Sequence, residues 1–191
     1  LFASSAFAQD FDYSIEASIG LGSTSISQEN YTAAQLKARV LFLNRLQISI
    51  DSSGATRGYF STNPSTGFQE NYIESISVAS LTGGLRVFDQ NRVSITPFGG
   101  SGTILIGSPE PRFSSLEVMS LVYGVDAQAR FDDYSTQLDF RLLGSTDDAG
   151  TGLGNYIETG IRFGSRFGLV GTFRQYLEGP NTVLLSLSWR I

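Results

Sequence analysis

The sequence predicts an all-β fold: an up-and-down antiparallel transmembrane β-barrel of about ten strands, with about eight strands as the alternative. Two observations predict it. Apolar and polar residues alternate through most of the 191-residue chain, which is typical of strands with two unlike faces. Short connections also alternate with longer ones, as expected where hairpins turn tightly on one side of a membrane and form loops on the other.

Five strands are expected in the first half of the chain. The first alternates over residues 11–21, close to the length of about 9–11 residues that a tilted strand needs to cross a bilayer. The next four are expected at 34–42, 46–51, 73–87 and 93–97. The polar stretch Ser52–Asn71 is expected to be a long loop.

Two parts of this half break the pattern. The alternation weakens over Ile73–Ala79, which leaves open whether this stretch is a bulged strand or an extracellular ridge. Pro97 and the pair Gly99-Gly100 predict a bulge or bend, because proline cannot donate to a ladder and glycine inside a strand often marks a bulge.

Five further strands follow in one continuous domain. They are expected at 119–131, 134–142, 157–163, 167–173 and 183–191, separated by loops at 108–114, 145–155 and 179–181. An even strand count with short turns in the periplasm places both chain ends on the periplasmic side. The expected short turns are Leu43–Arg45, Phe88–Arg92, Asp132–Asp133 and Gly164–Arg166.

The N-terminal segment has the features of an export signal. Residues 1–8 are mostly apolar and end in Ala6-Phe7-Ala8, an A-x-A pattern that resembles the cleavage site of a secretory signal peptide. We therefore expect a residual signal segment at 1–8 and a barrel domain at 9–191, exported through a cleaved signal peptide. A disordered apolar N-terminus is the alternative.

The composition narrows the function classes. A net charge of -5 and a pI of about 4.7 argue against a nucleic-acid partner, which needs a clustered basic surface. The sequence has no apolar run of the roughly 18 residues that indicates a transmembrane helix. Mean hydropathy is near zero, as expected where only alternate residues meet lipid.

Alternation alone does not say which face points outward. A soluble lipocalin-like barrel or sandwich buries its apolar face, whereas a membrane barrel turns it to lipid. The polar face carries mid-strand ions of both signs, such as Asp126 with Arg130 and Asp139 with Arg141, which favours an enclosed ionic lumen. Lys37 is the one lysine beside twelve arginines, and arginine is preferred where charges are packed and paired. The expected lumen charge ladder comprises Glu16, Lys37, Arg39, Arg86, Asp126, Arg130, Asp139, Arg141, Glu158, Arg162, Arg174 and Arg190.

Aromatic residues gather near the ends of the expected strands, as in the girdles at a water–lipid boundary. The upper girdle is expected to include Tyr59, Tyr72, Phe113, Tyr156 and Tyr176. The lower girdle, near the short turns, comprises Phe42, Phe88, Phe131, Tyr134, Phe163, Phe167 and Trp189.

The last strand carries alternating apolar residues up to a terminal hydrophobe: Leu185, Leu187, Trp189 and Ile191. It resembles the C-terminal recognition strand that the barrel-assembly machinery reads in outer-membrane β-barrels, with Ile191 where phenylalanine is more usual. Over about 9–191 the pattern resembles the small Gram-negative outer-membrane β-barrel superfamily, which includes the OmpA-like and OmpX-like barrels. No subfamily is identified. The resemblance implies an outer-membrane location, with outer-membrane lipid and lipopolysaccharide as partners and the barrel-assembly machinery during biogenesis.

The residues offer little for catalysis. The chain has no histidine and no cysteine, so a histidine base of the kind common in barrel enzymes and a thiol nucleophile are both missing. Asp132-Asp133 is better explained by turn chemistry than by an aspartate pair. Asp147-Asp148 lies in a glycine-rich segment where a calcium site is the alternative to a surface loop. We expect no enzymatic activity, cofactor or metal.

Two functions remain. In the first, the barrel is a membrane-embedded scaffold whose extracellular loops mediate surface interactions. In the second, the lumen is a narrow pore that passes small solutes or ions. About eight strands give an interior that side chains fill, and 16–18 leave an open channel. About ten strands with an ion-rich lumen therefore favour the scaffold, with an unknown surface ligand.

Overall fold

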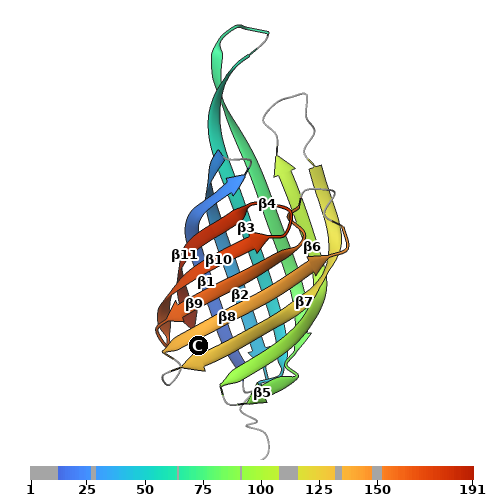
Figure 1. The fold of residues 1–191 in the computed structure, drawn as a ribbon, viewed down its shortest axis with the longest axis vertical. Coiled ribbons are helices and arrows are strands. Elements are labelled where there is room, and N and C mark those ends of the chain that lie inside the picture. The colour runs from blue at the N-terminus through green and yellow to red at the C-terminus, as the bar shows by residue number, and fades with distance from the viewer. Residues whose placement is uncertain are drawn as a thin grey trace, which may run out of the picture.

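The barrel is built from ten long antiparallel strands (Figure 1). The computed structural model describes residues 13–26, 29–63, 65–90, 92–107, 116–131, 135–147 and 152–191. The described residues contain no helix that is long and apolar enough to cross a membrane. The strands are β1 Tyr13–Ile26, β2 Glu29–Phe42, β3 Leu46–Thr62, β4 Gln69–Leu85, the short β5 Phe88–Gln90, β6 Val93–Gly107, β7 Leu116–Phe131, β8 Thr136–Ser145, β9 Tyr156–Phe163, β10 Phe167–Tyr176 and β11 Asn181–Arg190.

The sheet closes on itself. Each long strand pairs with the next one along the chain, and β4 pairs directly with β6 because β5 only flanks the lower end of β6. The first and last strands complete the circle, from Glu16 opposite Arg190 to Ser25 opposite Asn181. The expectation of a closed antiparallel barrel of about ten strands is confirmed.

Tight turns join the strands at the lower end of the barrel. Leu43 and Asn44 have φ angles of 50° and 54°, as in hairpin turns with left-handed central residues. Gly164 has a φ of 113°, and a Cβ there would come within 2.1 Å of the carbonyl oxygen of Phe167. Glycine is therefore required in the β9–β10 turn.

The prediction of a long loop at Ser52–Asn71 is wrong. β3 continues to Thr62 and β4 begins at Gln69, and the two strands pair without interruption over this length. Serine, threonine and glycine occupy many of these positions, so the alternation that marked the other strands is missing although the backbone pairing persists. Beyond Thr56 and Ser75, the described residues of β3 and β4 pair only with each other. This projecting hairpin rises above the rest of the barrel (Figure 1).

Of the two irregular stretches, one forms a regular strand and the other contains a shift in register. Ile73–Ala79 keeps one register with β3, and from Ser75 onward it keeps one register with β6. Near Pro97, β6 keeps one register with β7, but on its other side the register shifts by one residue between Gly84 opposite Phe98 and Phe88 opposite Ile95, which agrees with the expected bulge or bend. Gly100 permits close approach of β4 and β6, because a Cβ there would lie 2.0 Å from the carbonyl oxygen of Leu81.

Several expectations fall outside the described residues. They concern the signal segment 1–8, the loop 108–114, the turn Asp132–Asp133 and part of the loop 145–155. The described C-terminus lies at the lower, short-turn end (Figure 1).

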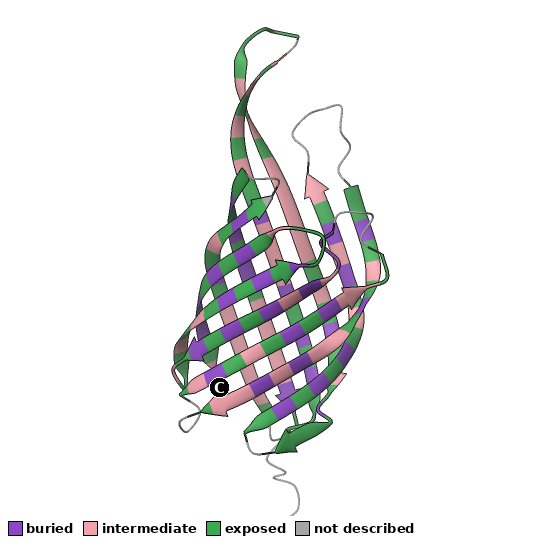
Figure 2. Cartoon of the chain, in the orientation of Figure 1, coloured by how far each residue is buried: buried purple, intermediate pink, exposed green. Residues whose placement is uncertain are grey.

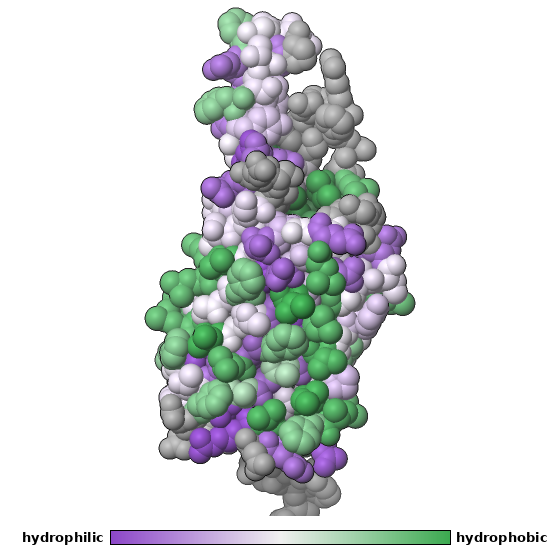
Figure 3. All heavy atoms as spheres, viewed as in Figure 1, coloured by the Kyte–Doolittle hydropathy of each residue, from purple (hydrophilic) through white to green (hydrophobic). Residues whose placement is uncertain are grey.

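The outer face of the barrel is apolar and the inner face is polar. Exposed and buried residues alternate along the strands (Figure 2), and hydrophobic side chains cover much of the visible outer wall (Figure 3). On β11, Leu185 is 63% exposed whereas its neighbour Ser186 is 3% exposed. A soluble lipocalin-like barrel would place these aliphatic residues inside, and the structure places them outside.

We predict that the protein in detergent migrates at a heat-modifiable position on a gel. The continuous ladder between β1 and β11 leaves no edge from which unfolding can start, so the unboiled protein stays compact. Electrophoresis of unboiled and boiled samples measures the shift. Equal mobility of the two samples would contradict a closed, resistant barrel.

Candidate functional site

The middle of the lumen is filled by six charged side chains from six strands. Each occupies an inward position of the alternating pattern, so β2, β3, β7, β8, β9 and β10 contribute one residue each. We call them the ionic core: Lys37, Asp51, Asp126, Arg141, Glu158 and Arg174.

Asp51 joins the two halves of the ionic core. Its Oδ2 accepts a 2.9 Å hydrogen bond from Nη2 of Arg174 and lies 3.5 Å from Nη1 of Arg141 and 3.7 Å from Nζ of Lys37. Gln35 donates to Oδ1 at 3.2 Å. The expected strand at 46–51 already placed Asp51 on its polar side with Gln47 and Ser49, but the predicted charge ladder left Asp51 out.

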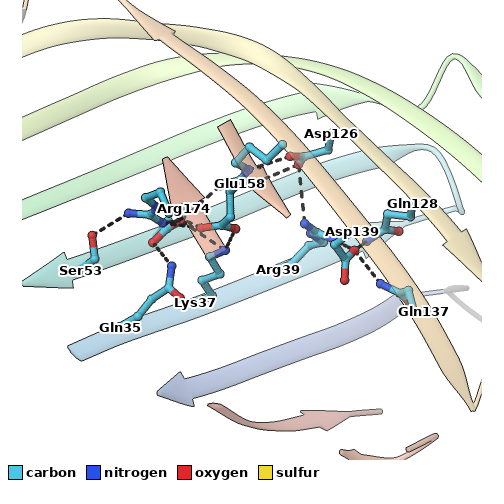
Figure 4. Close-up of polar contacts among 12 residues, drawn as sticks. Gln35, Lys37, Arg39, Ser53, Asp126, Gln128, Gln137, Asp139, Glu158 and Arg174 are labelled. Atoms are coloured by element: carbon cyan, nitrogen blue, oxygen red, sulfur yellow. Dashed lines mark hydrogen bonds and ion pairs between the residues drawn. The ribbon is translucent and has the colours of Figure 1, made fainter. Parts of the chain in front are cut away.

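Two ion pairs of the core join neighbouring strands. Asp126 lies directly opposite Arg141 and accepts two hydrogen bonds from it, Nε to Oδ1 at 2.6 Å and Nη2 to Oδ2 at 2.9 Å. Glu158 lies opposite Arg174 and accepts a 2.9 Å bond from its Nε. Lys37 also pairs with Glu158 across the lumen (Figure 4).

Register between neighbouring strands decides these partners. Residues two or four apart on one strand are separated by about 7 or 13 Å, whereas directly opposite residues have Cβ atoms about 5 Å apart. Asp126 on β7 therefore finds its bidentate partner on β8, and Glu158 on β9 finds Arg174 on β10.

A second layer lies below the ionic core. Glu16 accepts hydrogen bonds from Nη1 of Arg162 at 2.7 Å and Nη2 of Arg190 at 3.1 Å. Arg39 lies between two carboxylates, with Nη2 3.6 Å from Oδ2 of Asp126 and Nη1 3.9 Å from Oδ1 of Asp139.

Glutamine side chains complete this layer. Gln128 and Gln137 donate to Oδ1 of Asp139 at 2.9 and 2.7 Å (Figure 4). Gln137 in turn accepts a 2.7 Å bond from Arg190. These glutamines had no place in the predicted ladder, although their inward phase was visible in the sequence.

The residues of the predicted charge ladder lie together on the inner face. For eleven of the twelve, a described residue of opposite charge lies within 4 Å. Arg130, the twelfth, lies on the same face of β7 two residues beyond Gln128. Arg86 pairs with Asp89 at 3.1 Å near the lower end.

Little free space remains among these charges. A cavity of about 60 Å³ is lined by residues that include Glu16, Lys37, Arg39 and Asp139. That volume holds a few water molecules. Two smaller cavities of about 20 and 30 Å³ lie beside Arg174 and Leu153.

Apolar and aromatic side chains cover the upper side of the ionic core. Leu153, Tyr156 and Tyr176 belong to a buried cluster with residues of β6, β7 and β8. The guanidinium of Arg174 lies 4.2 Å from the ring centroid of Tyr156. Tyr156 is 2% exposed, so placing it and Tyr176 in an upper girdle was wrong. Both fall at inward positions of β9 and β10.

The other predicted aromatic and C-terminal residues lie as follows. Tyr59 and Tyr72 stack on each other in the projecting hairpin, with ring centroids 5.8 Å apart. Tyr134 and Phe113 lie outside the described residues. The remaining lower-girdle residues are exposed on the barrel surface: Phe42, Phe88, Phe131, Phe163, Phe167 and Trp189. The outward residues of the last strand and chain end are also exposed: Leu185, Leu187, Trp189 and Ile191.

The charged and polar side chains of the lumen form their salt bridges and hydrogen bonds with one another. Within the described ranges, no group of three or more histidine, cysteine, aspartate or glutamate side chains is arranged to hold a metal ion. Asp147 is described, and Asp148 is not.

Solved structures resemble the barrel at low identity. Ail from Yersinia pestis, crystallised with the heparin analogue sucrose octasulfate, is 15% identical, with 94% of this chain and 97% of that chain covered and a TM-score of 0.41. Neisserial surface protein A is 11% identical, with 94% and 96% covered and a TM-score of 0.36. A major outer membrane protein from Thermus thermophilus is 13% identical, with 94% and 99% covered and a TM-score of 0.45.

No protein family model and no curated protein matches the chain. Structural similarities at this level do not establish function. The function proposed below therefore rests on the surface and interior of the barrel itself.

We predict that Asp51→Asn destabilises the barrel by about 3–5 kcal/mol, because removing one member of a buried ion network leaves uncompensated charge. The free energy of unfolding in urea measures the loss. Glu117→Gln removes an exposed carboxylate outside the network and serves as the control, with an expected change within about 0.5 kcal/mol. Equal effects of the two substitutions would contradict a structural role for the ionic core.

Proposed function

We propose that the protein is an integral β-barrel of a Gram-negative outer membrane that acts as a scaffold. Its closed lumen holds the barrel in one shape, and its extracellular loops and projecting hairpin mediate interactions at the cell surface. The observation that carries this proposal is the reversal of faces: aliphatic side chains cover the outside and ion pairs fill the inside.

The outer wall supports insertion into a lipid bilayer. Leu185, Leu187 and Leu169 form part of one continuous apolar surface with Ile19 and Leu21 across paired strands β10, β11 and β1. Such a surface in water would be an unusually large exposed apolar area for a monomeric soluble protein. Hydrocarbon removes that cost, and the closed ladder leaves no strand edge facing lipid.

The filled lumen supports a scaffold in preference to a pore. The cavity among the charged side chains measures about 60 Å³, and charged side chains bridge the lumen above and below it. A hydrated ion or solute would have to displace several buried salt bridges to pass. Such displacement is expensive, because each broken bridge leaves an unpaired buried charge.

The projecting hairpin supplies a surface for contact with other molecules. On its inner side, Arg57 pairs with Glu29 and lies over the rings of Tyr31 and Tyr59, at 5.8 and 5.5 Å. On its outer side, Phe60 is 75% exposed. A paired ribbon with an ordered ionic side and an exposed aromatic side suits recognition better than a flexible loop does.

Other features of the chain fit the same proposal. The exposed aromatic residues near the short turns suit the periplasmic boundary of the membrane, and the outer leaflet brings lipopolysaccharide to the loop end. The apolar last strand suits recognition by the barrel-assembly machinery. Export through a cleaved signal peptide at 1–8 belongs to the same proposal.

We predict that Leu185→Arg destabilises the inserted barrel by about 2–4 kcal/mol, because the substitution places a charge on the lipid-facing wall near its middle. Refolding into lipid vesicles at graded urea concentrations measures the effect. Thr56→Arg changes an exposed residue near the upper end of the wall and serves as the control, with an expected cost of about 0–1 kcal/mol. A neutral Leu185→Arg would indicate that this surface faces water.

We predict little or no single-channel conductance in planar bilayers. The reason is the small interior cavity between layers of buried salt bridges. The measurement is current at fixed voltage with the reconstituted protein, and an open porin reconstituted alongside confirms that the bilayers report conductance. Steady openings of porin size would reverse the preference for a scaffold over a pore.

A further inference from the structure

The upper part of β3 has an edge without a neighbouring strand. β2 pairs with β3 only as far as Thr32 opposite Thr56, and its first residue, Glu29, would reach Tyr59 if that register continued. Beyond Tyr59, no described strand lies on this side of β3. The projecting hairpin rises past the ends of β1 and β2 (Figure 1). We call this part of β3 the open edge.

The hydrogen bonds between β3 and β4 show which backbone groups face the open edge. Asn63 donates its backbone N–H to the carbonyl of Phe68 at 2.9 Å, so the backbone groups of Asn63 face β4. Successive residues of an antiparallel ladder face opposite sides in turn, and β3 keeps one register with β4 throughout. The backbone N–H and C=O groups of Phe60 and Thr62 therefore point away from β4, toward the open edge.

The open edge lacks the features that usually protect the edge of a sheet. Protected edges carry charged side chains, proline or a bulge, or they are covered. Residues 58–62 are uncharged and include no proline, and Arg57 below them is already paired with Glu29. The other strand of the hairpin carries Glu70 and Glu74. The open edge is therefore suited to pairing with another strand.

We propose that the open edge pairs antiparallel with the same edge of a second copy of this chain in an apposed membrane. The proposal rests on the membrane-inserted barrel proposed above and names a partner for its projecting hairpin. A two-fold axis at Ser61 sets that residue opposite itself and sets Phe60 of each copy opposite Thr62 of the other. Each Phe60–Thr62 pair exchanges both of its backbone hydrogen bonds, because these residues face the open edge.

The side chains on both sides of the hairpin suit an identical partner. Phe60 is 75% exposed on the outer side, and the two Phe60 rings lie diagonally across the pair, within reach of each other. On the inner side serine meets serine, and a hydroxyl can both donate and accept a hydrogen bond. Residues 59–63 are uncharged, so no like charges lie directly opposite each other.

The direction of β3 excludes this pairing within one membrane. β3 runs from the short-turn end toward the tip in every copy, so two copies related by a two-fold axis in one membrane present parallel strands. Such a pair would set the aromatic outer side of one hairpin beside the ionic inner side of the other. Antiparallel pairing requires the second copy to point in the opposite direction, as it does in an apposed membrane.

Pairing of β3 with β4 of a neighbour in the same membrane fails for a different reason. Two hairpins joined in this way lie about 10 Å apart, because each contributes two strands spaced at about 4.8 Å. A barrel of ten such strands is at least about 15 Å wide, so the two barrels would collide. Apposed copies meet only through their projecting hairpins and avoid this collision.

The charge of the loop end predicts how salt affects the contact. Described carboxylates at this end, which include Glu70, Glu74, Glu117 and Glu178, outnumber Arg57, so two apposed loop ends repel each other. Salt screens this repulsion and leaves backbone hydrogen bonds and aromatic contacts in place. One such contact is short, but many copies in each membrane act together. Adhesion through the open edge should therefore strengthen with salt.

The test uses phosphatidylcholine vesicles that carry the inserted full chain, with light scattering as the measure of clustering. We expect wild-type vesicles to cluster, and to cluster more at high salt than at low salt. Thr62→Pro removes an N–H from the open edge and should reduce clustering at least about tenfold, because each contact loses backbone hydrogen bonds. Gln69→Pro changes the directly opposite residue, whose N–H points away from β3, and should leave clustering unchanged.

Single cysteines locate the contact, because the chain has no cysteine of its own. Ser61→Cys should form disulfides between differently tagged copies carried by separate vesicle populations, since directly opposite Cα atoms of this kind lie about 4.5 Å apart. Ser65→Cys makes the same change at the more exposed tip and should form at least about tenfold fewer disulfides. Random collisions would favour Ser65→Cys instead.

Four results would overturn the inference: no clustering by inserted wild-type protein, equal loss of clustering in Gln69→Pro, disulfides at Ser65→Cys as frequent as at Ser61→Cys, or entry of protein-free vesicles into the clusters. The last result would assign the hairpin to lipid. Failure of the wild type to insert into vesicles would instead contradict the proposed membrane barrel.

Discussion

Closure of the sheet is the constraint on which the rest of the structure depends. An unpaired backbone group in hydrocarbon costs several kcal/mol, so the ladder between β1 and β11 must be complete for a barrel that spans a membrane. Complete ladders leave no freedom of register. A slip of one residue in any strand would turn its leucines into the lumen and its arginines outward to lipid. The position of every charged side chain therefore follows from closure.

The interior explains the preference for arginine. A buried charge must satisfy its hydrogen bonds with neighbours, because few waters fit inside. Arg141 achieves this with two parallel bonds to Asp126, and Arg174 reaches Asp51, Glu158 and Ser53 from one planar group. A lysine ammonium is a point charge on a flexible chain and would define such a lattice less well. Lys37, the one lysine, has the simpler task of bridging two carboxylates.

Much of the fold was predictable from residue alternation, because the outer face of the barrel carries an apolar residue at every second position. The prediction failed where the strands lack that pattern. Ser52–Thr62 continues a strand without apolar alternation, and Asp51, at the end of the expected strand, was left out of the predicted charge ladder. The inward phase of most ionic residues was visible in the sequence. The partners of these residues were not visible in the sequence, because Lys37 and Glu158 lie 121 residues apart and meet only after the barrel closes.

The length of the projecting hairpin determines how far its tip extends above the barrel. Its strands are paired to Thr62 and Gln69, so its height above the rim is set by residue count, at roughly 3.3 Å of strand per residue. Shortening both strands by two residues would lower the tip by about 7 Å and keep every remaining side chain on its original side. Shortening by one would exchange the two sides and turn Phe60 toward the side that now carries Arg57. The height of the tip and the side on which each side chain lies are therefore coupled. Only a change by an even number of residues in each strand keeps the same side chains on the same side of the hairpin.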